Sequence, residues 1–530
     1  MSKNDLELSV VSDNTALPSQ HGSYYSSPDD ATLKRLGKRP LLNRSFGFMS
    51  ILGLCCSSMC SWEGILVTSV PSLLAGGPAA VVWAFVVGWI GITSVYIVLA
   101  ELSSIAPTAG GQYHWVAMLA PESCHNFLAY LTAWLTILAW EAMAVTVSYL
   151  VATVLQGIVA LTRPTYIPLP WHTMLLMWAT AVFAVSINST TGRILARFEG
   201  LILMLHLAGF FGILVPLVYF APHNEPSEVF TNFYNNAGWS TEALAFLVGL
   251  PSMSSSLIGA DCAVHMSEEI TNASTTVPQA LLYSVFINGS LAFGMVIALM
   301  FCLTDLPAAV AATDTMFYPF LQVFQSGVRS TAGACAMASI VLVLAIASSL
   351  GVYASASRMV WSFARDKGLP FDRHLVKLTK GSTLPLYAIF LTMAVTILLS
   401  LIVLGSAVAL SALLSLVVGA LYASYLLVCG LTLWRRLAGH FQPYRAGEDD
   451  PEGLRWGPWK VPEPFGTMNN VFACVYSAFL FFWSFWPQVY MPTPETANWS
   501  TLVFGVVVLY SIVWYTLRAR SYFKGPIKEL

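Results

Sequence analysis

The sequence predicts an all-α polytopic membrane protein with twelve transmembrane helices. Of its 530 residues, 56% are hydrophobic and only 10% are charged, a composition far from that of soluble globular domains. Apolar stretches long enough to cross a bilayer recur along the chain. Two of these stretches are interrupted by small and polar residues, at matching places of two successive halves. That pattern predicts a five-plus-five inverted repeat with discontinuous helices 1 and 6, followed by two C-terminal helices.

The predicted spans follow a tail that is rich in Ser, Asp, Asn and Pro, a composition typical of disorder. The twelve spans cover residues 46–70, 78–103, 126–155, 172–190, 199–220, 243–266, 278–303, 332–360, 384–404, 407–432, 469–487 and 499–518. The predicted divisions are a disordered cytoplasmic tail (1–45), a transport core (46–432, with repeats at about 46–220 and 243–432), a cytoplasmic loop (433–468), helices 11 and 12 (469–518) and a cytoplasmic tail (519–530).

The orientation follows from the basic residues. With twelve spans, 23 of the 25 Lys and Arg residues lie on the side of both termini, and only Arg163 and Arg329 lie opposite. Positive residues favour the cytoplasmic side, so we expect both termini there. Asn498 begins an Asn-Trp-Ser glycosylation sequon on the outer side, close to the last span. We expect a multi-pass protein of the plasma membrane, with a vacuolar or other internal membrane as the alternative.

The first interruption lies in span 46–70 and covers Ser57 to Gly64. Its candidate substrate-binding residues are Cys60, Ser61, Trp62, Glu63 and Gly64. Half-helices meeting there would direct N–H groups toward a carboxylate, while free carbonyls suit an ammonium group. A mid-span carboxylate such as Glu63 is costly unless it is protonated, paired or in contact with water. Glu63 could therefore bind a substrate cation, carry a proton or line the edge of a wet cleft, and Trp62 could offer a cation–π face or simply pack.

The second interruption lies in span 243–266 and begins at Pro251. Its candidate substrate-binding residues are Ser254, Ser255, Ser256, Gly259 and Asp261. Small residues are also common where membrane helices touch, so helix packing is the alternative interpretation of both clusters. Asp261 and His265 share one helix face, and Glu268 and Glu269 follow. These groups could form a gate or a proton exit, or be solvated charges at a helix end.

Two further ionisable residues lie deep inside spans. Glu141 is central in the third span, and His206 lies about 14 Å from the cytoplasmic end of the fifth by helix rise. An intramembrane ionisable group indicates function by default, and histidine titrates near neutral pH. We therefore take His206, Glu141 and Glu63 as candidates for proton coupling, with a hydrogen-bonded structural histidine as the alternative for His206.

The sequence predicts no cofactor and no metal. Its nine cysteines mostly fall within apolar stretches, without a Cys-x-x-Cys pair or a His/Cys cluster. The charge is segregated along the chain, and we expect no nucleic-acid partner. The expected partners are a small amine or amino-acid solute, protons and the lipid bilayer. No nucleophile elbow, phosphate loop or metal motif supports a membrane enzyme.

Four segments resemble the fungal amino-acid/choline permease family, which includes GABA and choline permeases and belongs to the amino acid–polyamine–organocation superfamily. The most specific is the run AELSSIAPTAGGQYHW at 100–115, with Gly-Gly-Pro at 76–78 before it. The others are GADCAVHMSEE at 259–269, LHLAGFF at 205–211, and Ser-Arg at 357–358 with FARDKGLP at 363–370. The resemblance covers about residues 40–520.

The resemblance implies secondary active transport of amino-acid-like or quaternary-amine compounds, with the substrate between the breaks of spans one and six. Relatives tend to have Asn-Ser-Trp at the first break, where this chain has Cys60, Ser61 and Trp62, followed by Glu63. An added carboxylate would suit a more cationic or alkaloid-like compound. The leading hypothesis is a proton-coupled importer that works by alternating access. The alternatives are an exporter or exchanger of an amine or alkaloid metabolite, and a non-transporting nutrient sensor.

Overall fold

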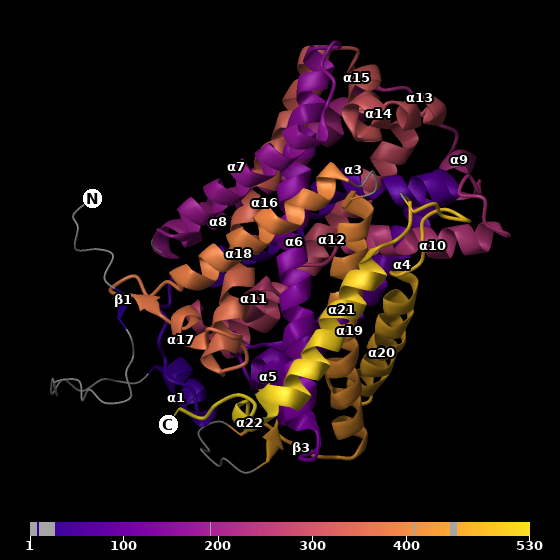
Figure 1. Cartoon of the computed structure of the whole chain (residues 1–530). Coiled ribbons are helices and arrows are strands. Elements are labelled where there is room, and N and C mark those ends of the chain that lie inside the picture. The colour runs from indigo at the N-terminus through magenta and orange to yellow at the C-terminus, as the bar shows by residue number, and fades with distance from the viewer. Residues whose placement is uncertain are drawn as a thin grey trace.

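The protein is a bundle of long helices with very little sheet (Figure 1). The computed structural model describes residues 8–9, 27–190, 192–405, 409–445, 453–494 and 496–529. Within these residues, eleven helices are long and apolar enough to cross a membrane. They are Phe48–Thr68, Val70–Ile105, His125–Thr162, Pro170–Asn188, Leu195–Phe220, Ala273–Cys302, Thr331–Arg365, Leu386–Leu404, Ser411–Leu437, Phe465–Trp483 and Ser500–Tyr522. The predicted fold class, an all-α polytopic membrane protein, is confirmed.

The helices of the bundle are labelled in chain order. The first half contains α1 (Pro28–Arg35), α2 (Phe48–Met59), α3 (Ser61–Thr68), α4 (Val70–Ile105), α5 (Gln112–Leu119), α6 (His125–Thr162), α7 (Pro170–Asn188), α8 (Gly192–Phe220) and α9 (Pro226–Phe230). The middle contains α10 (Glu242–Ser255), α11 (Cys262–His265), η1 (Ser267–Glu269), α12 (Ala273–Cys302), α13 (Leu306–Ala311), α14 (Thr313–Met316), α15 (Pro319–Val328) and α16 (Thr331–Arg365). The last part contains α17 (Asp372–Leu375), α18 (Leu386–Ser400), η2 (Leu401–Leu404), α19 (Ala409–Leu437), α20 (Phe465–Trp483), α21 (Ser500–Trp514), η3 (Tyr515–Ala519) and α22 (Arg520–Tyr522).

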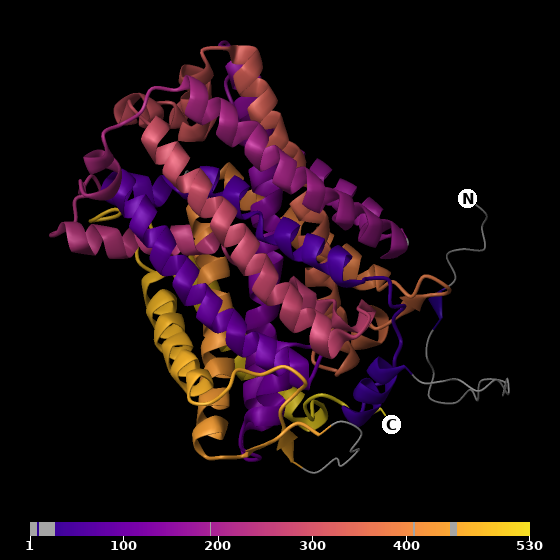
Figure 2. The same ribbon diagram turned by 180° about the vertical axis from the view of Figure 1, so that it is seen from behind.

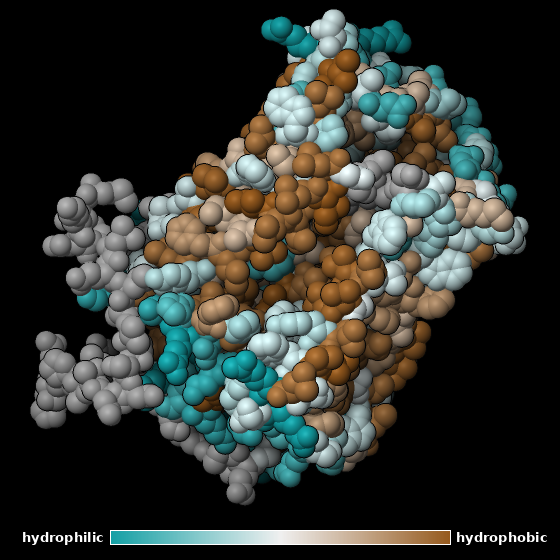
Figure 3. Space-filling view, in the orientation of Figure 1, coloured by the Kyte–Doolittle hydropathy of each residue, from teal (hydrophilic) through white to brown (hydrophobic). Residues whose placement is uncertain are grey.

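Short strand pairs lie at the end of the bundle that carries α1 and α22, which we call the terminal end (Figure 2). Strand β1 (Leu8–Ser9) pairs antiparallel with β2 (Leu378–Thr379), and β3 (Phe441–Gln442) pairs parallel with β4 (Leu454–Arg455). The apolar surface lies between the two ends. In Figure 3, hydrophobic residues cover the middle of the visible face, and hydrophilic residues gather at both ends. This distribution suits a molecule whose middle contacts lipid.

The long helix α6 runs through the centre of the bundle and packs against α16 and α19 (Figure 1). Helix α2 packs against α8 and α12, and α10 packs against α4. The two broken segments therefore pack against the long continuous helices α4, α8 and α12. Irregular backbone is tolerated at membrane depth only where protein surrounds it, and the neighbouring helices surround both breaks.

The first break is a single residue. Cys60 adopts a left-handed conformation (φ 46°), and α3 begins directly after it at Ser61. The N–H of Gly64 donates to the Cys60 carbonyl at 2.7 Å, so regular helical hydrogen bonding resumes at once. The prediction of an interruption from Ser57 to Gly64 is therefore wrong in extent. Glu63 lies in the first turn of a helix rather than in unwound backbone.

The second break is longer. Helix α10 ends at Ser255, residues 256–261 are irregular, and α11 begins at Cys262. The predicted start of the interruption at Pro251 is wrong, because Pro251 lies inside α10, where a proline removes one hydrogen bond without ending the helix. Since α10 has only 14 residues, this region is absent from the eleven long helices. The twelve-helix count stays a prediction.

The predicted disordered tail over residues 1–45 is wrong for its final part. Residues 1–7 and 10–26 lie outside the described residues, but α1 forms at 28–35 with a capping box between Ser27 and Asp30. Asp29 accepts hydrogen bonds from the backbone N–H groups of Asn272 (2.8 Å) and Ala273 (2.9 Å) at the start of α12. These local and long-range hydrogen bonds order a segment whose composition alone favours disorder.

Two helix boundaries in the structure also differ from the predicted limits of the spans. Helix α4 begins at Val70 with almost no connection after α3, and it kinks at Gly77, whose φ is +76°. At the C-terminal end, α21 continues through η3 and α22 to Tyr522, so the last helix extends past the predicted limit at residue 518.

Candidate functional site

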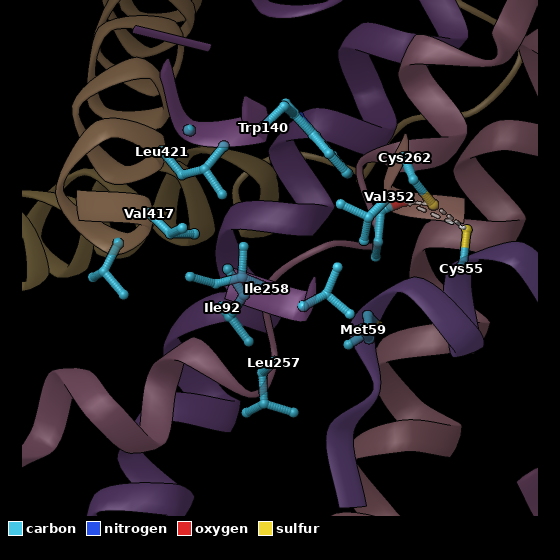
Figure 4. Close-up of a cluster of buried hydrophobic side chains, with 14 of the residues drawn as sticks. Cys55, Met59, Ile92, Trp140, Leu257, Ile258, Cys262, Val352, Val417 and Leu421 are labelled. Atoms are coloured by element: carbon cyan, nitrogen blue, oxygen red, sulfur yellow. Dashed lines mark hydrogen bonds between the residues drawn. The ribbon is translucent and has the colours of Figure 1, made fainter. Parts of the chain in front are cut away.

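The two breaks meet inside the bundle. A Cβ built on Gly259, whose φ is +115°, would lie 3.0 Å from the Ser58 carbonyl oxygen of α2. The Sγ atoms of Cys55 and Cys262 lie 3.8 Å apart, and the Cys55 thiol is 3.4 Å from the carbonyl oxygen of Ala260. Figure 4 shows Cys55 and Cys262 side by side, with Met59 and Ile258 nearby. The two breaks therefore pack closely against each other, and the placement of a substrate between them stays a prediction.

Glu63 belongs to a buried polar cluster on the α8 side of the first break. Its Oε1 lies 2.7 Å from Nδ1 of His206, and Nε2 of His206 lies 2.9 Å from Oδ1 of Asn288 on α12. All three side chains are at most 2% exposed. The ring of Trp62 lies 5.7 Å from the His206 ring and 6.0 Å from the Phe210 ring. Two of the predicted proton-coupling residues, Glu63 and His206, are therefore in direct contact.

Asp261 belongs to a second cluster, on the α5 and α6 side of the second break. Gln112 donates to its Oδ2 at 2.9 Å, whereas its Oδ1 has no hydrogen-bond partner. The side chains of Trp140 on α6 and Tyr425 on α19 adjoin the carboxylate. In the described part of the chain, no Lys, Arg or His forms an ion pair with Asp261. A buried carboxylate without a basic partner is suited to a cation or a proton.

The three predicted serines face different neighbours. Ser254 lies 3.1 Å from the hydroxyl of Tyr476 on α20, away from the first break. Ser255 donates to the Ser252 carbonyl at 2.6 Å and is only partly buried, like Cys60. Only Ser256 faces the first break, with its Cβ 3.8 Å from the position of a Cβ on Gly64. Ser61 is fully buried, and its hydroxyl has no partner.

Glu141 lies apart from the Glu63–His206 pair. Thr392 on α18 donates to its Oε1 at 2.8 Å, and its Oε2 has no hydrogen-bond partner. The three predicted proton-coupling residues are therefore not one cluster. The structure also shows Glu199 on α8, which sequence reasoning missed. Ser57 donates to Glu199 Oε2 at 2.7 Å, and the side chain is completely buried. Glu199 is the first residue of the predicted span 199–220, where a carboxylate is expected to contact water, so the sequence did not indicate its burial.

The terminal end of the bundle is closed by ion pairs. Glu268 lies 2.9 Å from Arg365, and Glu269 lies 2.8 Å from Arg358, both pairs joining η1 to α16. Lys38 forms an ion pair with Asp366, and Tyr113 donates to the same carboxylate at 2.7 Å. The interpretation of Glu268 and Glu269 as solvated helix-end charges is wrong, since both are buried. Their ion pairs fit a gate.

The side chain of Asn498 is engaged inside the protein. Its amide donates to the carbonyls of Ser484 (3.1 Å) and Trp486 (3.2 Å), and its Oδ1 accepts from the Ser500 hydroxyl at 2.5 Å. Glycosylation would consume an amide hydrogen that these contacts use, so the geometry opposes the predicted modification at Asn498.

A multi-helix apolar bundle with two broken helices meeting at its centre defines the class of the protein, a multi-pass membrane transport protein. The chain belongs to the amino acid permease family, whose model matches residues 46–509. The predicted resemblance to fungal permeases and the prediction of a transporter rather than an enzyme are both confirmed.

Three fungal relatives illustrate the similarity. A choline transporter of Saccharomyces cerevisiae is 28% identical over 489 residues, covering 91% of this chain and 83% of its own. An uncharacterized amino-acid permease of Schizosaccharomyces pombe is 28% identical over 506 residues, covering 94% of this chain and 90% of its own. Amino-acid permease 2 of Neurospora crassa is 25% identical over 503 residues, covering 94% and 89%.

Proposed function

We propose that the protein is a proton-coupled secondary transporter of an amino acid or a related amine, working by alternating access. The observation that carries this proposal is the contact between Glu63 and His206 at the first break. A carboxylate and an imidazole 2.7 Å apart can hold one proton between them. A proton bound at a helix break can bias the arrangement of the two half-helices.

The solute binds at the meeting of the breaks, on the α5 and α6 side. Asp261 offers a carboxylate to an ammonium group, and the polar groups of Trp140 and Tyr425, the indole N–H and the phenol hydroxyl, lie next to that carboxylate. The names of the relatives, amino-acid permeases and a choline transporter, support a solute with a positively charged nitrogen. Substrates whose only charge is negative fit this site poorly, because the Asp261 carboxylate would repel them.

The gate at the terminal end completes the proposed cycle. Opening toward that end separates η1 from α16, which requires the Glu268–Arg365 and Glu269–Arg358 pairs to break. The basic residues predict that this end faces the cytoplasm. We place the protein in the plasma membrane with both termini inside, so transport runs inward when the outside is more acidic.

The decisive experiment is uptake by the purified protein in proteoliposomes. Labelled amino acids, choline and primary amines are offered with and without an inside-alkaline pH gradient. The proposal expects accumulation that requires the gradient, and His206→Ala should abolish accumulation while leaving solute exchange. Accumulation without a gradient would contradict proton coupling. Tight binding without uptake would instead indicate a sensor, and gradient-driven extrusion would indicate an exporter.

A further inference from the structure

Asn288 on α12 joins the proton pair to the first break. Its side chain is completely buried. Its Oδ1 lies 2.9 Å from Nε2 of His206, and its Nδ2 lies 3.2 Å from the carbonyl oxygen of Cys56 and 3.3 Å from Sδ of Met59. One amide side chain thus contacts the imidazole on α8 and the last turn of α2.

The contact with Cys56 fixes which way the amide points. A backbone carbonyl can only accept a hydrogen bond, so the group that faces Cys56 must be the NH₂ of Asn288. The reversed orientation would place two acceptors 3.2 Å apart. The oxygen of Asn288 therefore faces His206, and Nε2 of His206 must carry a hydrogen and donate it.

This assignment locates the exchangeable proton. With one hydrogen held on Nε2, the remaining proton lies between Nδ1 of His206 and Oε1 of Glu63, which are 2.7 Å apart. The pair is then an imidazolium with a carboxylate, or a neutral imidazole with a carboxylic acid. If that proton leaves, two acceptors face each other at hydrogen-bond distance, which is unfavourable in a buried site. Loss of the proton therefore destabilises the contact between α3 and α8.

The same amide reaches the break itself. The Cys56 carbonyl that accepts from Asn288 also accepts from the N–H of Cys60, the left-handed residue that separates α2 from α3. A shift of His206 relative to Asn288 would therefore change the hydrogen bonding of the helical turn next to the break. The titratable groups around the Glu63–His206 pair are the thiols of Cys56 and Cys60. The residues that α12 and α16 contribute next to it, Asn288 and Ser348, are neutral.

We propose that Asn288 is a positioning residue that holds the His206 hydrogen on Nε2 and transmits loss of the shared proton to the break between α2 and α3. This inference rests on the proposed proton coupling through Glu63 and His206. It gives α12 a part in coupling, although neither its apolar sequence nor the position of Asn288 in the seventh predicted span indicated one.

Two substitutions test the positioning role. Asn288→Leu removes both polar contacts at similar volume, and we expect gradient-driven accumulation to fall at least about tenfold while exchange at equal pH stays within about threefold. Asn288→Asp keeps an acceptor toward Nε2 and adds a negative charge, which favours the imidazolium. The pH of half-maximal uptake should then move upward by about one to three units. Asn288→Leu adds no charge but removes the acceptor of the Nε2 hydrogen, so it should move that pH downward, whereas loss of a side chain with only a packing role would leave the pH unchanged.

The matched control is Asn470→Leu. Asn470 on α20 is equally buried and donates to the carbonyl of Cys429 at 3.0 Å, but it contacts no histidine. Asn470→Leu should leave the pH profile unchanged. If the wild type shows no gradient dependence, the proposed function itself fails. If the wild type is coupled but Asn288→Asp leaves the pH profile unshifted, or Asn288→Leu matches Asn470→Leu, only the positioning role is overturned.

Folding of each variant is checked by size-exclusion chromatography of the purified protein. Should neither substitution at Asn288 yield a monodisperse sample, Asn288→Ser is measured in their place, because it is smaller and still polar. A serine cannot span both partners, so accumulation should again fall at least about tenfold while exchange persists. Accumulation equal to that of the wild type would overturn the proposal.

Discussion

Glu63 and Asp261 are both buried carboxylates at a helix break, yet their surroundings differ. Glu63 faces an imidazole that can share its charge, and it lies within a regular helical turn. Asp261 accepts a hydrogen bond from the neutral Gln112, and no described basic residue pairs with it. The difference teaches that a carboxylate with a built-in titratable partner is suited to a proton, and one without such a partner is suited to a cationic ligand.

The largest expected effect concerns the backbone at which the two breaks pack together. Gly259→Ala should reduce uptake by at least about tenfold, because the +115° φ is strained for alanine and its Cβ would meet the Ser58 carbonyl at 3.0 Å. Gly64→Ala should have a much smaller effect, since its Cβ would have only an ordinary contact with Ser256 at 3.8 Å. Initial uptake rates at equal surface expression measure both. Equal losses would show that the breaks do not differ in this way.

The second prediction separates the roles of the two carboxylates. Asp261→Asn should weaken binding of an ammonium-bearing solute by at least about tenfold, roughly 1.4 kcal/mol. Glu63→Gln should change that affinity less and instead remove the dependence of accumulation on the pH gradient. Competition binding and gradient-driven uptake are measured on the same preparations. The assignment is reversed if Glu63→Gln costs more affinity than Asp261→Asn.

A smaller effect is expected at the third mid-span carboxylate. Glu141 contacts Thr392 rather than the His206 pair. Glu141→Gln keeps the shape and a hydrogen-bond acceptor, so gradient-driven accumulation should change by less than about twofold. Uptake in parallel with His206→Ala provides the comparison. A loss as large as that of His206→Ala would extend the coupling network to α6 and α18.

The smallest effect is expected at the terminal end. The Glu529 carboxylate contacts Arg365 at 2.5 and 2.7 Å and accepts from the Arg39 N–H at 2.8 Å. Burial raises the pKa of Glu529, but Arg365, the Arg39 N–H and the charge of Lys38 together lower it further, so the pKa lies below its ordinary value of 4.5. The stabilisation by this group is therefore complete above pH 4.5 and is lost as the pH falls through the lowered pKa.

Glu529→Gln mimics that loss at neutral pH. The C-terminal segment should then be cleaved a few-fold faster by carboxypeptidase, since fewer charge-assisted hydrogen bonds hold it. Lys524→Gln is the control, because Lys524 is exposed and its ammonium group donates to the Arg520 carbonyl rather than to a carboxylate. If both variants are cleaved at the wild-type rate, the ion pairs of Glu529 do not hold the segment in place.

Much of the fold could be predicted because its signals are local. Apolar runs of sufficient length indicated the long helices, and Gly259 with its small neighbours marked the second break. The exact form of the breaks could not be predicted. A left-handed Cys60 and a proline tolerated inside α10 depend on the neighbours that pack around them, which no local pattern encodes.

The sequence by itself determined the class of protein, the position of the two breaks and the presence of ionisable residues at membrane depth. Only the tertiary structure decided how those residues pair. His206 meets Glu63 across 143 positions of the chain, and Gln112 meets Asp261 across 149. Burial makes each carboxylate depend on whichever polar group the packing brings within about 3 Å. Because that neighbour comes from a distant helix, the proposed division between proton site and ligand site is a property of the packed bundle.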